Sequence, residues 1–470
     1  MKLLFLQDNG INESLALTEL SAFLKSNGHK CDLLLEDEER HFLQKVSAYN
    51  PDVILIPATI LGWKWALDTS KKIKQHFDIP VIIGGEYPTF YPEVIENDSV
   101  DIICRGEAEH AILELLQRIE DGKSITDINN LYVKQNGKIY RNDMRMLIAN
   151  LDELPMPDRE LYYKYKFLRN IPLKRFSSGR GCHNSCTYCP NTNLRSEYED
   201  KVRCIYVRKK SVNRIIEEIL YIKEKYPLSM VHFSDDIFIW NVRWVEDFCD
   251  AYSKKVGLPF TFNTTADSLT SALIEKLKSA GCSGIAFGIE TGNEERRVKI
   301  LNKHVSNDQL LRAAGWLHAN GIRLATFNII AIPGEEIEEA FETVHFNQLL
   351  KPDVPRVNIY LPLKNTRLTE YGFKKGCIEG GMTGVAINKL GEDRKFKNLH
   401  ILFPYAVKYP TLENIIRKLV KLPLYSFYKL FELRKIYDEK KFYRIPFISG
   451  LRFYYHCNPT KRTKNFHFLI

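Results

Sequence analysis

Residues 178–190 read Ser-Gly-Arg-Gly-Cys-His-Asn-Ser-Cys-Thr-Tyr-Cys-Pro. The three cysteines are Cys182, Cys186 and Cys189, spaced Cys-x3-Cys-x2-Cys, and the aromatic Tyr188 precedes the last of them. Three thiolates on one loop can hold three irons of a 4Fe–4S cluster. The fourth iron would then have no protein ligand and could bind a small molecule. The motif therefore predicts a redox enzyme.

Two simpler sites would use some of the same residues. Cys186 and Cys189 could form half of a zinc site, with His183 completing a three-Cys-one-His tetrahedron. Adjacent Cys182 and His183 can hardly bind one zinc ion without strain, however. A thioredoxin-like thiol pair needs only two cysteines and leaves Cys182 unexplained. The spacing favours the iron–sulfur cluster.

The bulk composition is that of a globular protein with two or three domains. The chain has 470 residues, of which 44% are hydrophobic. We expect no secretory signal, because the short run Leu3–Leu6 is soon followed by Asp8. No apolar stretch approaches the ~20 residues of a membrane span. The ten cysteines are mostly scattered, which predicts a cytoplasmic protein in a reducing compartment.

The net charge of +9 is unevenly distributed. Residues 1–150 carry 16 Lys and Arg against 23 Asp and Glu, a balance of −7. Residues 411–470 carry 13 against 4, a balance of +9. The positive excess therefore lies toward the C-terminal end, where it bears on binding partners.

Residues 1 to about 125 alternate strand and helix patterns. Short apolar runs between helices indicate a parallel sheet covered on both faces. The expected strands are 2–7, 31–35, 52–57, 80–83 and 101–104, and the expected helices are 12–27, 63–77 and 109–120. Ligands of such sheets bind at the carboxyl ends of the strands. Gly84, Gly85 and Gly106 lie there and permit close approach of a ligand to the backbone.

Residues 136–170 form a predicted linker after this domain. Asn136-Gly137 is a strong hairpin turn signal within the alternating stretch 130–140. Leu151–Asp158 reads as an extended segment that contains two prolines.

Strand and helix patterns resume from Leu173 to about Lys364. The expected strands are 230–233, 260–263, 284–289, 324–332 and 357–360, and the expected helices include 211–225, 271–280 and 308–320. This order fits a partial β/α barrel, whose site lies at the carboxyl mouth of the strands. The cysteine loop follows the first strand, which places it at that mouth.

Candidate site residues end the later barrel strands. They are Ser234, Asp235 and Asp236 after the second strand, Asn263 at the third, Glu290 at the fourth and Ile332 at the fifth. The acidic ones also have structural interpretations. Asp235 or Asp236 could cap a helix, and Glu290 could be a salt-bridge partner.

The cysteine spacing resembles that of the radical SAM superfamily. The segments Gly84–Phe90 and Cys104–Glu109, placed before that motif, resemble the cobalamin-binding domain of the cobalamin-dependent radical SAM class. The resemblance implies a Rossmann-like cobalamin-binding domain over 1–135, a linker over 136–170, a radical SAM core over 171–385 and a helical, basic segment over 386–470. It covers the family's motifs in order across about 160 residues of the core.

The resemblance also implies cofactors and their ligands. Cys182, Cys186 and Cys189 would bind the 4Fe–4S cluster, whose open iron S-adenosylmethionine chelates. The implied contacts of S-adenosylmethionine are Tyr188, Ser234, Asp235, Asp236, Asn263, Glu290 and Ile332. The implied contacts of cobalamin are Thr59, Gly84, Gly85, Gly106 and Glu107.

Three departures from the family patterns limit this transfer. The Asp-x-His-x-x-Gly motif, whose histidine ligates cobalt, is absent, and Asp8–Asn12 is the nearest stretch. Thr265 replaces an arginine that many relatives have, and Ala331 stands where relatives often have glycine. The N-terminal domain could also be a scaffold that binds no corrinoid.

The C-terminal stretch Leu412–Leu433 is basic and amphipathic, with aromatic residues toward its end. Such a stretch can lie on an anionic membrane surface, or bind nucleic acid. It can also be a helical subdomain that closes the barrel, with solvated lysines. No RNA-binding motif is present, so nucleic acid is disfavoured.

These features together predict a radical SAM enzyme that reductively cleaves S-adenosylmethionine and uses cobalamin. The expected reaction is radical methyl transfer to an unactivated carbon of a small-molecule or lipid substrate. The resemblance implies reduced flavodoxin or ferredoxin as electron donor, and the basic segment suggests a location at the inner face of the membrane. One alternative is a radical SAM oxidoreductase or cyclase, with or without cobalamin. Another is a zinc-stabilised nucleic-acid-binding protein.

Overall fold

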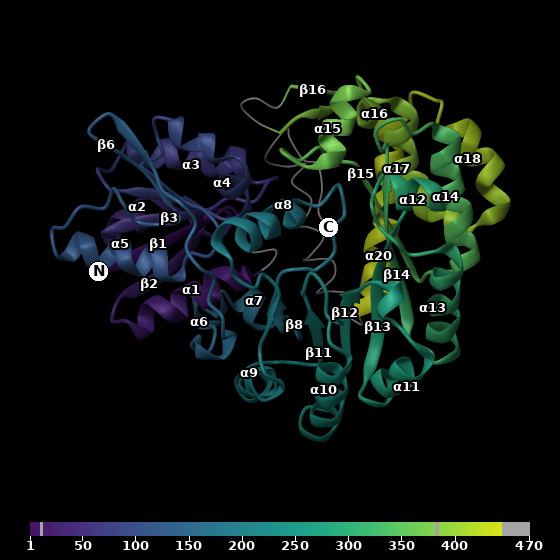
Figure 1. Ribbon diagram of the computed structural model, residues 1–470, viewed down its shortest axis with the longest axis horizontal. Helices are drawn as coiled ribbons and strands as arrows, with labels where there is room; N and C mark the ends of the chain where they lie inside the picture. Colours follow the sequence, from purple (N-terminus) through teal and green to yellow (C-terminus); the bar gives the residue numbers. More distant parts are fainter. Residues whose placement is uncertain (10–12, 381–384, 444–470) are drawn as a thin grey trace. The chain divides into compact units, whose positions relative to one another are not determined.

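The computed structural model describes residues 1–9, 13–380 and 385–443. Within them the chain forms two compact units (Figure 1). The first consists of residues 1–171 and 197–205, and the second of residues 172–196 and 206–443.

The first unit is built on a seven-stranded sheet with the order β2-β1-β3-β4-β5-β6-β7. The strands from β1 to β5 are parallel, and β6 and β7 run antiparallel to their neighbours. Their bounds are β1 Lys2–Gln7, β2 Lys30–Leu35, β3 Val53–Pro57, β4 Val81–Gly84, β5 Ile102–Cys104, β6 Leu131–Gln135 and β7 Lys138–Arg141. The five predicted parallel strands are thus confirmed.

Five helices accompany this sheet: α1 Leu15–Ser26, α2 Phe42–Tyr49, α3 Trp63–Lys74, α4 Glu86–Phe90 and α5 Glu109–Glu120. The Ser14 side chain caps α1 by accepting a hydrogen bond from the Leu17 amide, as short hydroxyl side chains do at helix starts. The predicted helices 63–77 and 109–120 are confirmed. The predicted helix 12–27 is observed as Leu15–Ser26, so it begins later than predicted, and Asn12 lies outside the described residues.

The predicted linker contributes secondary structure to the first unit. The hairpin turn at Asn136-Gly137 is confirmed, because both residues have positive φ and join β6 to β7. The segment 151–158 lies over α1, where Ser21 Oγ donates to Asp158 Oδ2 at 2.6 Å. The short helices α6 (Glu160–Tyr163) and α7 (Lys166–Arg169) follow.

The second unit contains a six-stranded, all-parallel sheet with the order β15-β14-β13-β12-β11-β8. Its strands are β8 Leu173–Phe176, β11 Met230–Phe233, β12 Phe260–Thr264, β13 Cys282–Glu290, β14 Arg323–Ile330 and β15 Val354–Ile359. Helices connect the strands: α9 Val212–Lys225, α10 Val242–Lys255, α11 Ser271–Ser279, α12 Glu294–Lys299, α13 Asn307–Ala319, α14 Ile337–Leu350 and α15 Arg367–Lys374. The partial β/α barrel is confirmed.

Short elements complete this unit. The two-stranded ribbons are β9 Gly179–Arg180 with β10 Arg208–Lys209, and β16 Ile378–Glu379 with β17 Ile387–Asn388. The remaining helices are α8 Pro190–Ser196, α16 Lys389–Glu392, α17 Arg394–Lys408, α18 Glu413–Leu419, α19 Tyr425–Tyr428 and α20 Leu433–Tyr443. The C-terminal segment is therefore helical where it is described, and residues 444–470 lie outside the described part.

The C-terminal helices share a hydrophobic core with the barrel. Phe396, Leu399 and Phe403 of α17 pack with Val357 of β15 and Phe341 of α14. The amphipathic stretch after them is divided between α18 and α19. Across the described residues, no helix is both long and apolar enough to span a bilayer.

Candidate active site

The cysteine loop lies between β9 and α8 and is tied to the segment that follows α12. The Thr187 amide donates to the Leu301 carbonyl at 3.0 Å, and Thr187 Oγ1 donates to the Ile300 carbonyl at 2.7 Å. The Ser185 carbonyl accepts from Asn302 Nδ2 at 2.8 Å. These bonds fix the backbone on both sides of Cys186.

Two glycines allow the backbone of residues 206–208 to lie close to the start of this loop. A Cβ on Gly181 would lie 2.7 Å from the Tyr206 carbonyl oxygen, and Gly181 has a φ of +88°. A Cβ on Gly179 would lie 2.5 Å from the Arg208 carbonyl oxygen. Both positions therefore require glycine, because the strand β10 lies against the backbone there.

The three cysteines are free thiols in surroundings that favour the neutral form. Burial raises the pKa of Cys189 to about 12, and burial also raises the pKa of Cys182 and of Cys186. Such thiols become ligands at neutral pH when a metal replaces their proton. Three soft donors on one fixed loop fit a 4Fe–4S cluster.

The zinc alternative has less support. His183 is exposed. Among the described residues, no three His, Cys, Asp or Glu side chains converge as the ligands of one metal ion. A four-iron cluster does not need that convergence, because each of its three thiolates binds a different iron.

Asp235, at the end of β11, anchors the start of the cysteine loop. Its Oδ1 accepts from Ser178 Oγ at 2.6 Å and from Lys209 Nζ at 2.9 Å, and its Oδ2 accepts from the Ser178 amide at 3.1 Å. Asp235 and Lys209 are both buried or nearly so. This carboxylate is engaged within the protein, so its observed role is structural and the role predicted toward S-adenosylmethionine gains no support.

Its neighbours are placed differently. Ser234 Oγ accepts from Arg175 Nε at 2.8 Å. Asp236 is exposed, and Asn191 Nδ2, just past the cysteines, donates to it at 3.0 Å. Desolvation and the nearby Asp235 raise the pKa of Asp236. Asp236 is thus the predicted carboxylate of this pair that lies beside the cysteine loop and stays accessible.

Glu290, at the end of β13, is joined directly to the cysteine loop. Its Oε1 accepts from Tyr188 Oη at 2.9 Å and from Lys303 Nζ at 2.6 Å. The carboxylate and the ammonium are each buried, with side chains 8% exposed. Glu290 is therefore a salt-bridge partner, and it also lies at the predicted site. Lys303 was not predicted from the sequence.

A second unpredicted residue, Arg297, holds the backbone around Glu290. Its guanidinium is fully buried and donates to the carbonyls of Ile289 at 3.0 Å and Thr291 at 2.6 Å. It also donates to the Val305 carbonyl at 2.9 Å. Glu290 itself has a φ of +67°, which is uncommon for a residue with a side chain. Arg297 therefore stabilises a strained backbone at the site.

The turn after β14 is fixed in the same way by Glu335. The Ile332 amide donates to Glu335 Oε2 at 3.1 Å, and the Glu335 amide donates to the Ile332 carbonyl at 2.8 Å. Burial raises the pKa of Glu335 to about 8. Ala331, in this turn, has a φ of +59°, a conformation that glycine adopts more readily than alanine.

The predicted residues of the barrel mouth divide into two groups. Tyr188 contacts Glu290 and packs against a hydrophobic cluster that contains Ile332 and Leu301. The structure thus brings Tyr188, Glu290 and Ile332 together. Asn263 lies on β12, where its carbonyl accepts from the Phe238 amide at 3.0 Å, and no direct bond to the cysteine loop is seen for it within the described residues.

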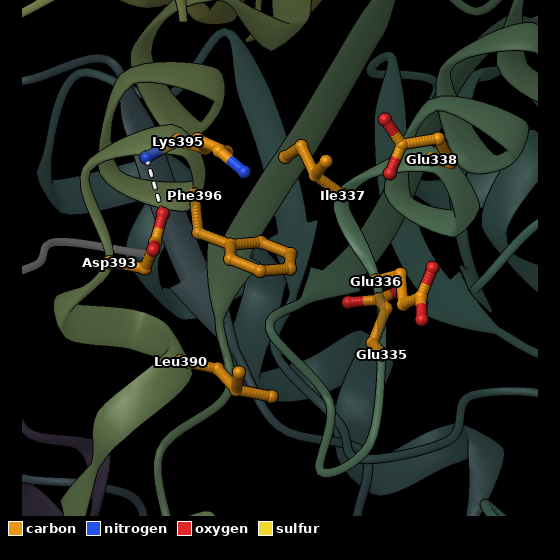
Figure 2. A pocket seen from close by; sticks show the side chains of 8 residues that line it. All are labelled: Glu335, Glu336, Ile337, Glu338, Leu390, Asp393, Lys395 and Phe396. Atoms are coloured by element: carbon orange, nitrogen blue, oxygen red, sulfur yellow. Dashed lines mark hydrogen bonds between the residues drawn. The ribbon is translucent and has the colours of Figure 1, made fainter. Parts of the chain in front are cut away.

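A pocket lies near the predicted site but is not lined by its residues (Figure 2). It is formed where α14 and α17 begin, and its lining includes Glu335, Ile337, Leu390 and Phe396. A bond from the Lys395 amide to Asp393 at 2.7 Å caps α17 at its edge. Among the predicted site residues none lines this pocket, and only Glu335 connects it to the turn at Ile332.

In the first unit, Gly84 and Gly85 lie at the carboxyl end of β4. A Cβ on Gly85 would lie 3.0 Å from the Ala58 carbonyl oxygen, and its φ is +102°. Thr59 follows β3, is exposed, and accepts from the Gly62 amide at 3.0 Å. In the order β2-β1-β3, successive strands are added first on one side of β1 and then on the other. Open α/β sheets bind ligands at such a switch point.

Gly106 and Glu107 have structural roles at the end of β5. A Cβ on Gly106 would collide with Tyr198 and Met144, so this glycine makes room for the protein's own side chains. Glu107 accepts from the Ile148 amide at 3.1 Å, and its carbonyl accepts from Asn130 Nδ2 at 2.8 Å. These contacts give no support to their predicted role toward cobalamin.

Asp8 lies at the carboxyl end of β1. Its pKa is raised to about 6, chiefly by burial and also by Asp37. The rest of the stretch that was compared with the histidine motif, residues 10–12, lies outside the described residues.

Comparison with known families supports the two predicted parts. Residues 176–346 match the family model of the radical SAM superfamily, and residues 1–116 match that of the B12 binding domain. An uncharacterised methyltransferase of Pyrococcus horikoshii is 27% identical over 338 residues, which are 71% of this chain and 72% of that protein. An anaerobic magnesium-protoporphyrin IX monomethyl ester cyclase of Rubrivivax gelatinosus is 24% identical over 73% of this chain, and the match spans 63% of that cyclase, less than two thirds.

Solved structures show the same fold. The cobalamin-dependent S-adenosylmethionine radical enzyme OxsB, with aqua-cobalamin bound, matches with a TM-score of 0.69 and 19% identity over 97% of this chain and 72% of its own. The radical S-adenosylmethionine methyltransferase TsrM of Kitasatospora setae matches with a TM-score of 0.64 and 15% identity over 78% and 75%. The chain therefore combines a domain that matches the radical SAM superfamily, and carries the cysteine loop at the barrel mouth, with an N-terminal domain that matches the B12 binding domain.

Proposed function

We propose that this enzyme transfers a methyl group to an unactivated carbon, using a 4Fe–4S cluster, S-adenosylmethionine and cobalamin. The observation that carries the proposal is the cysteine loop itself. Three free thiols lie on one loop that is bonded to the barrel at Ile300, Leu301 and Glu290. A loop fixed in this way holds a reactive cofactor in one place while electrons and substrate arrive.

The residues of the barrel mouth would have separate tasks. Cys182, Cys186 and Cys189 would hold the cluster, which would supply the electron for reductive cleavage of S-adenosylmethionine. Tyr188, Glu290 and Ile332 would form one wall of the site, and the Lys303 ammonium orients the Glu290 carboxylate. Ser234, Asp236 and Asn263 offer polar groups from the neighbouring strands. Buried apolar residues such as Leu301 exclude water from a reactive intermediate.

For cobalamin we propose the carboxyl edge of the first sheet, at Thr59, Gly84 and Gly85. Thr59 and Gly85 are exposed there, whereas the space at Gly106 is filled by Tyr198 and Met144. We also retain the proposed division into a cobalamin-binding domain (1–135), a linker (136–170), a radical SAM core (171–385) and a C-terminal segment (386–470).

The match to a cyclase supports a second candidate reaction, radical ring formation or oxidation. The substrate in either case is proposed to be a small molecule or a lipid. Reduced flavodoxin or ferredoxin is the proposed electron donor. The proposed location is the cytoplasm, at the inner face of the membrane.

The test is anaerobic reconstitution of the full chain with iron, sulfide and hydroxocobalamin. We expect about four irons and one cobalt per chain, with the visible absorption of an iron–sulfur cluster. The variant C182A/C186A/C189A should lose iron and sulfide but keep cobalt. The matched control C204A/C377A removes two other cysteines, both partly accessible, and should keep both cofactors.

The outcomes separate the two halves of the proposal. Iron without cobalt would overturn the cobalamin part alone, and an absence of iron would overturn the whole. Reaction of the loaded enzyme with S-adenosylmethionine bearing a deuterated methyl group then distinguishes the reactions. A mass increase in a product of cell extract supports methyl transfer, whereas 5′-deoxyadenosine formation with an unlabelled, altered product supports cyclisation or oxidation. If a soluble metabolite is labelled and no lipid is, the substrate is not a lipid.

A further inference from the structure

The C-terminal helices leave a group of large apolar side chains uncovered. Nine of the nineteen exposed large hydrophobic residues in the described part of the chain fall between residues 409 and 437. The most exposed are Leu430 at 65%, Tyr437 at 57% and Phe427 at 55%. We call Ile415, Leu422, Leu424, Phe427, Leu430 and Phe431 the C-terminal apolar surface. Single exposed apolar residues are ordinary, but a concentration of this kind marks an interaction site.

These side chains are exposed because the inner face of the same segment already fills the core. Ile416, Val420 and Tyr428 are buried against α14 and α17. Tyr428 Oη donates to the Leu419 carbonyl at 3.0 Å, which ties α19 to α18. Figure 1 shows α18 at the rim of the second unit. The outer face is therefore apolar in a segment that needs no further burial to fold.

The exposed apolar residues lie close to one another in space as well as in sequence. The Phe427 and Phe431 rings meet edge to face, with centroids 5.9 Å apart. Tyr405 Oη of α17 donates to the Phe431 carbonyl at 2.9 Å, which fixes the short helix that carries Leu430 and Phe431. The surface is thus held in shape by bonds to buried elements.

Lysines are interleaved with this surface. Lys418, Lys421 and Lys429 are exposed and alternate with its apolar members along the chain. Residues 409–437 contain six Lys and Arg against two Asp and Glu, and Glu413 is already paired with Arg417 at 2.8 Å. The surface therefore lies in a stretch of the chain with a net positive charge.

This combination favours a lipid partner over a macromolecular one. The cores of protein interfaces are depleted in lysine, whereas helices on membrane surfaces combine Lys and Arg with Leu and Phe. A nucleic-acid site would use cations and aromatic rings, but exposed leucine and isoleucine add nothing to it. Anionic headgroups meet the lysines, and acyl chains accept the leucine and phenylalanine side chains.

We propose that the C-terminal apolar surface docks this enzyme on the surface of an anionic phospholipid bilayer. The proposal does not depend on the radical chemistry, because it concerns a surface outside the barrel mouth. It names the residues that would mediate the membrane location proposed above.

The test is flotation of the full-length holoenzyme with vesicles of phosphatidylcholine alone and of an equal mixture with phosphatidylglycerol. We expect at least about tenfold stronger partition to the anionic vesicles. F427S/L430S should lower that partition about tenfold or more, because both side chains lose their burial in lipid. K418Q/K421Q/K429Q should lower it to about the level of neutral vesicles, and salt should weaken the binding of the parent.

Control variants use other exposed leucine and lysine residues elsewhere in the second unit. L311S/L349S and K254Q should bind vesicles like the parent. Thermal unfolding checks that each variant is folded, and the lysine variant tests the proposal even if the apolar variant does not fold. Equal binding to both vesicle types, or to neither, would overturn it. So would a dimer of the parent that F427S/L430S dissociates, or salt-sensitive retention of RNA that the lysine variant loses while vesicles are ignored.

Discussion

At the carboxyl end of β13, Gly288 leaves space that the Glu290 carboxylate and the Lys303 ammonium occupy. At the carboxyl end of β5, Gly106 leaves space that Tyr198 and Met144 occupy. Both glycines end a parallel strand at an edge where ligands bind, and both are filled by the protein. In the barrel the filling group is a charged pair joined to the cysteine loop, whereas in the first sheet it is a packing contact. The same sequence signal therefore makes room for a charged pair beside the cysteine loop at one strand end and for a packing contact at the other.

The largest expected effect concerns the arginine that holds Glu290. Arg297→Lys replaces a planar group with several fixed donors by a single ammonium, which cannot reach the Ile289, Thr291 and Val305 carbonyls together. Leaving buried carbonyls unpaired should lower the free energy of unfolding by about 3 kcal/mol or more. Urea denaturation measures the loss.

Arg312→Lys is the matched control, because Arg312 is exposed on α13. It should change stability by less than about 0.5 kcal/mol. An Arg297→Lys variant as stable as this control would show that the arginine does not hold the turn at Glu290.

The two glycines provide the next largest effect and test the comparison directly. Gly106→Ala should lower the stability of the first unit by about 2 kcal/mol, because a methyl there meets Tyr198 and Met144 and the φ is +67°. Gly288→Ala should displace the Glu290–Lys303 pair and cost a similar amount. The two variants are distinguished by the visible spectrum of the reconstituted iron–sulfur cluster.

Gly288→Ala should alter the visible spectrum of the iron–sulfur cluster and its response to S-adenosylmethionine, since Tyr188 loses its partner at Glu290. Gly106→Ala should leave both unchanged. Equal spectra in the two variants would remove the distinction between the strand ends.

The buried carboxyl of Glu335 gives a smaller effect that depends on pH. Its folded pKa of about 8 lies above the value in the unfolded chain. The folded state therefore holds a proton that the unfolded state releases, and stability falls as pH rises from about 4.5 to 8. Glu335→Gln keeps the shape of the protonated group without this penalty.

We expect Glu335→Gln to have nearly the stability of the parent at pH 5 and to be more stable by about 3 kcal/mol at pH 8, which raises its melting temperature there. Thermal unfolding across this range measures the difference. A constant difference at all pH values would show that Glu335 does not titrate between the two states.

The strands were predictable from the sequence, and the groups that hold the site were not. The apolar runs at 2–7 and 230–233 predict β1 and β11 with the observed bounds, because parallel strands are buried on both faces. Arg297 stands in the run Glu294-Glu295-Arg296-Arg297, which reads as an exposed, charged helix. The two neighbouring arginines are placed differently. Arg296 pairs with Glu339 at 2.7 Å, whereas Arg297 is fully buried.

Similar limits apply to the candidate ligands. The sequence placed Asp235 and Asp236 equally at the end of β11, and only their tertiary partners separate the buried anchor of Ser178 from the accessible carboxylate. Lys303 could have been suspected only by knowing that the segment after α12 returns to the cysteine loop. Such long-range pairings leave no trace in periodicity or composition.

The smallest expected effect comes from Ala331. Glycine there would relieve the left-handed φ of +59° but would lose a buried methyl and add freedom to the unfolded chain. Each of these effects amounts to roughly 1 kcal/mol. Relief of the backbone strain stabilises the variant, whereas the lost methyl and the added freedom of the unfolded chain destabilise it. Ala331→Gly should therefore change the free energy of unfolding by less than about 1 kcal/mol.

Ala340 is the matched comparison, because it is equally buried in the same hydrophobic cluster but lies within α14. Ala340→Gly should cost about 1–2 kcal/mol, since helix propensity and packing are lost together. If both variants lose the same amount, Ala331 carries no backbone strain. The turn at Ile332 would then owe its shape to the side chains of Glu335, Arg296 and Asn388, which bond to it directly.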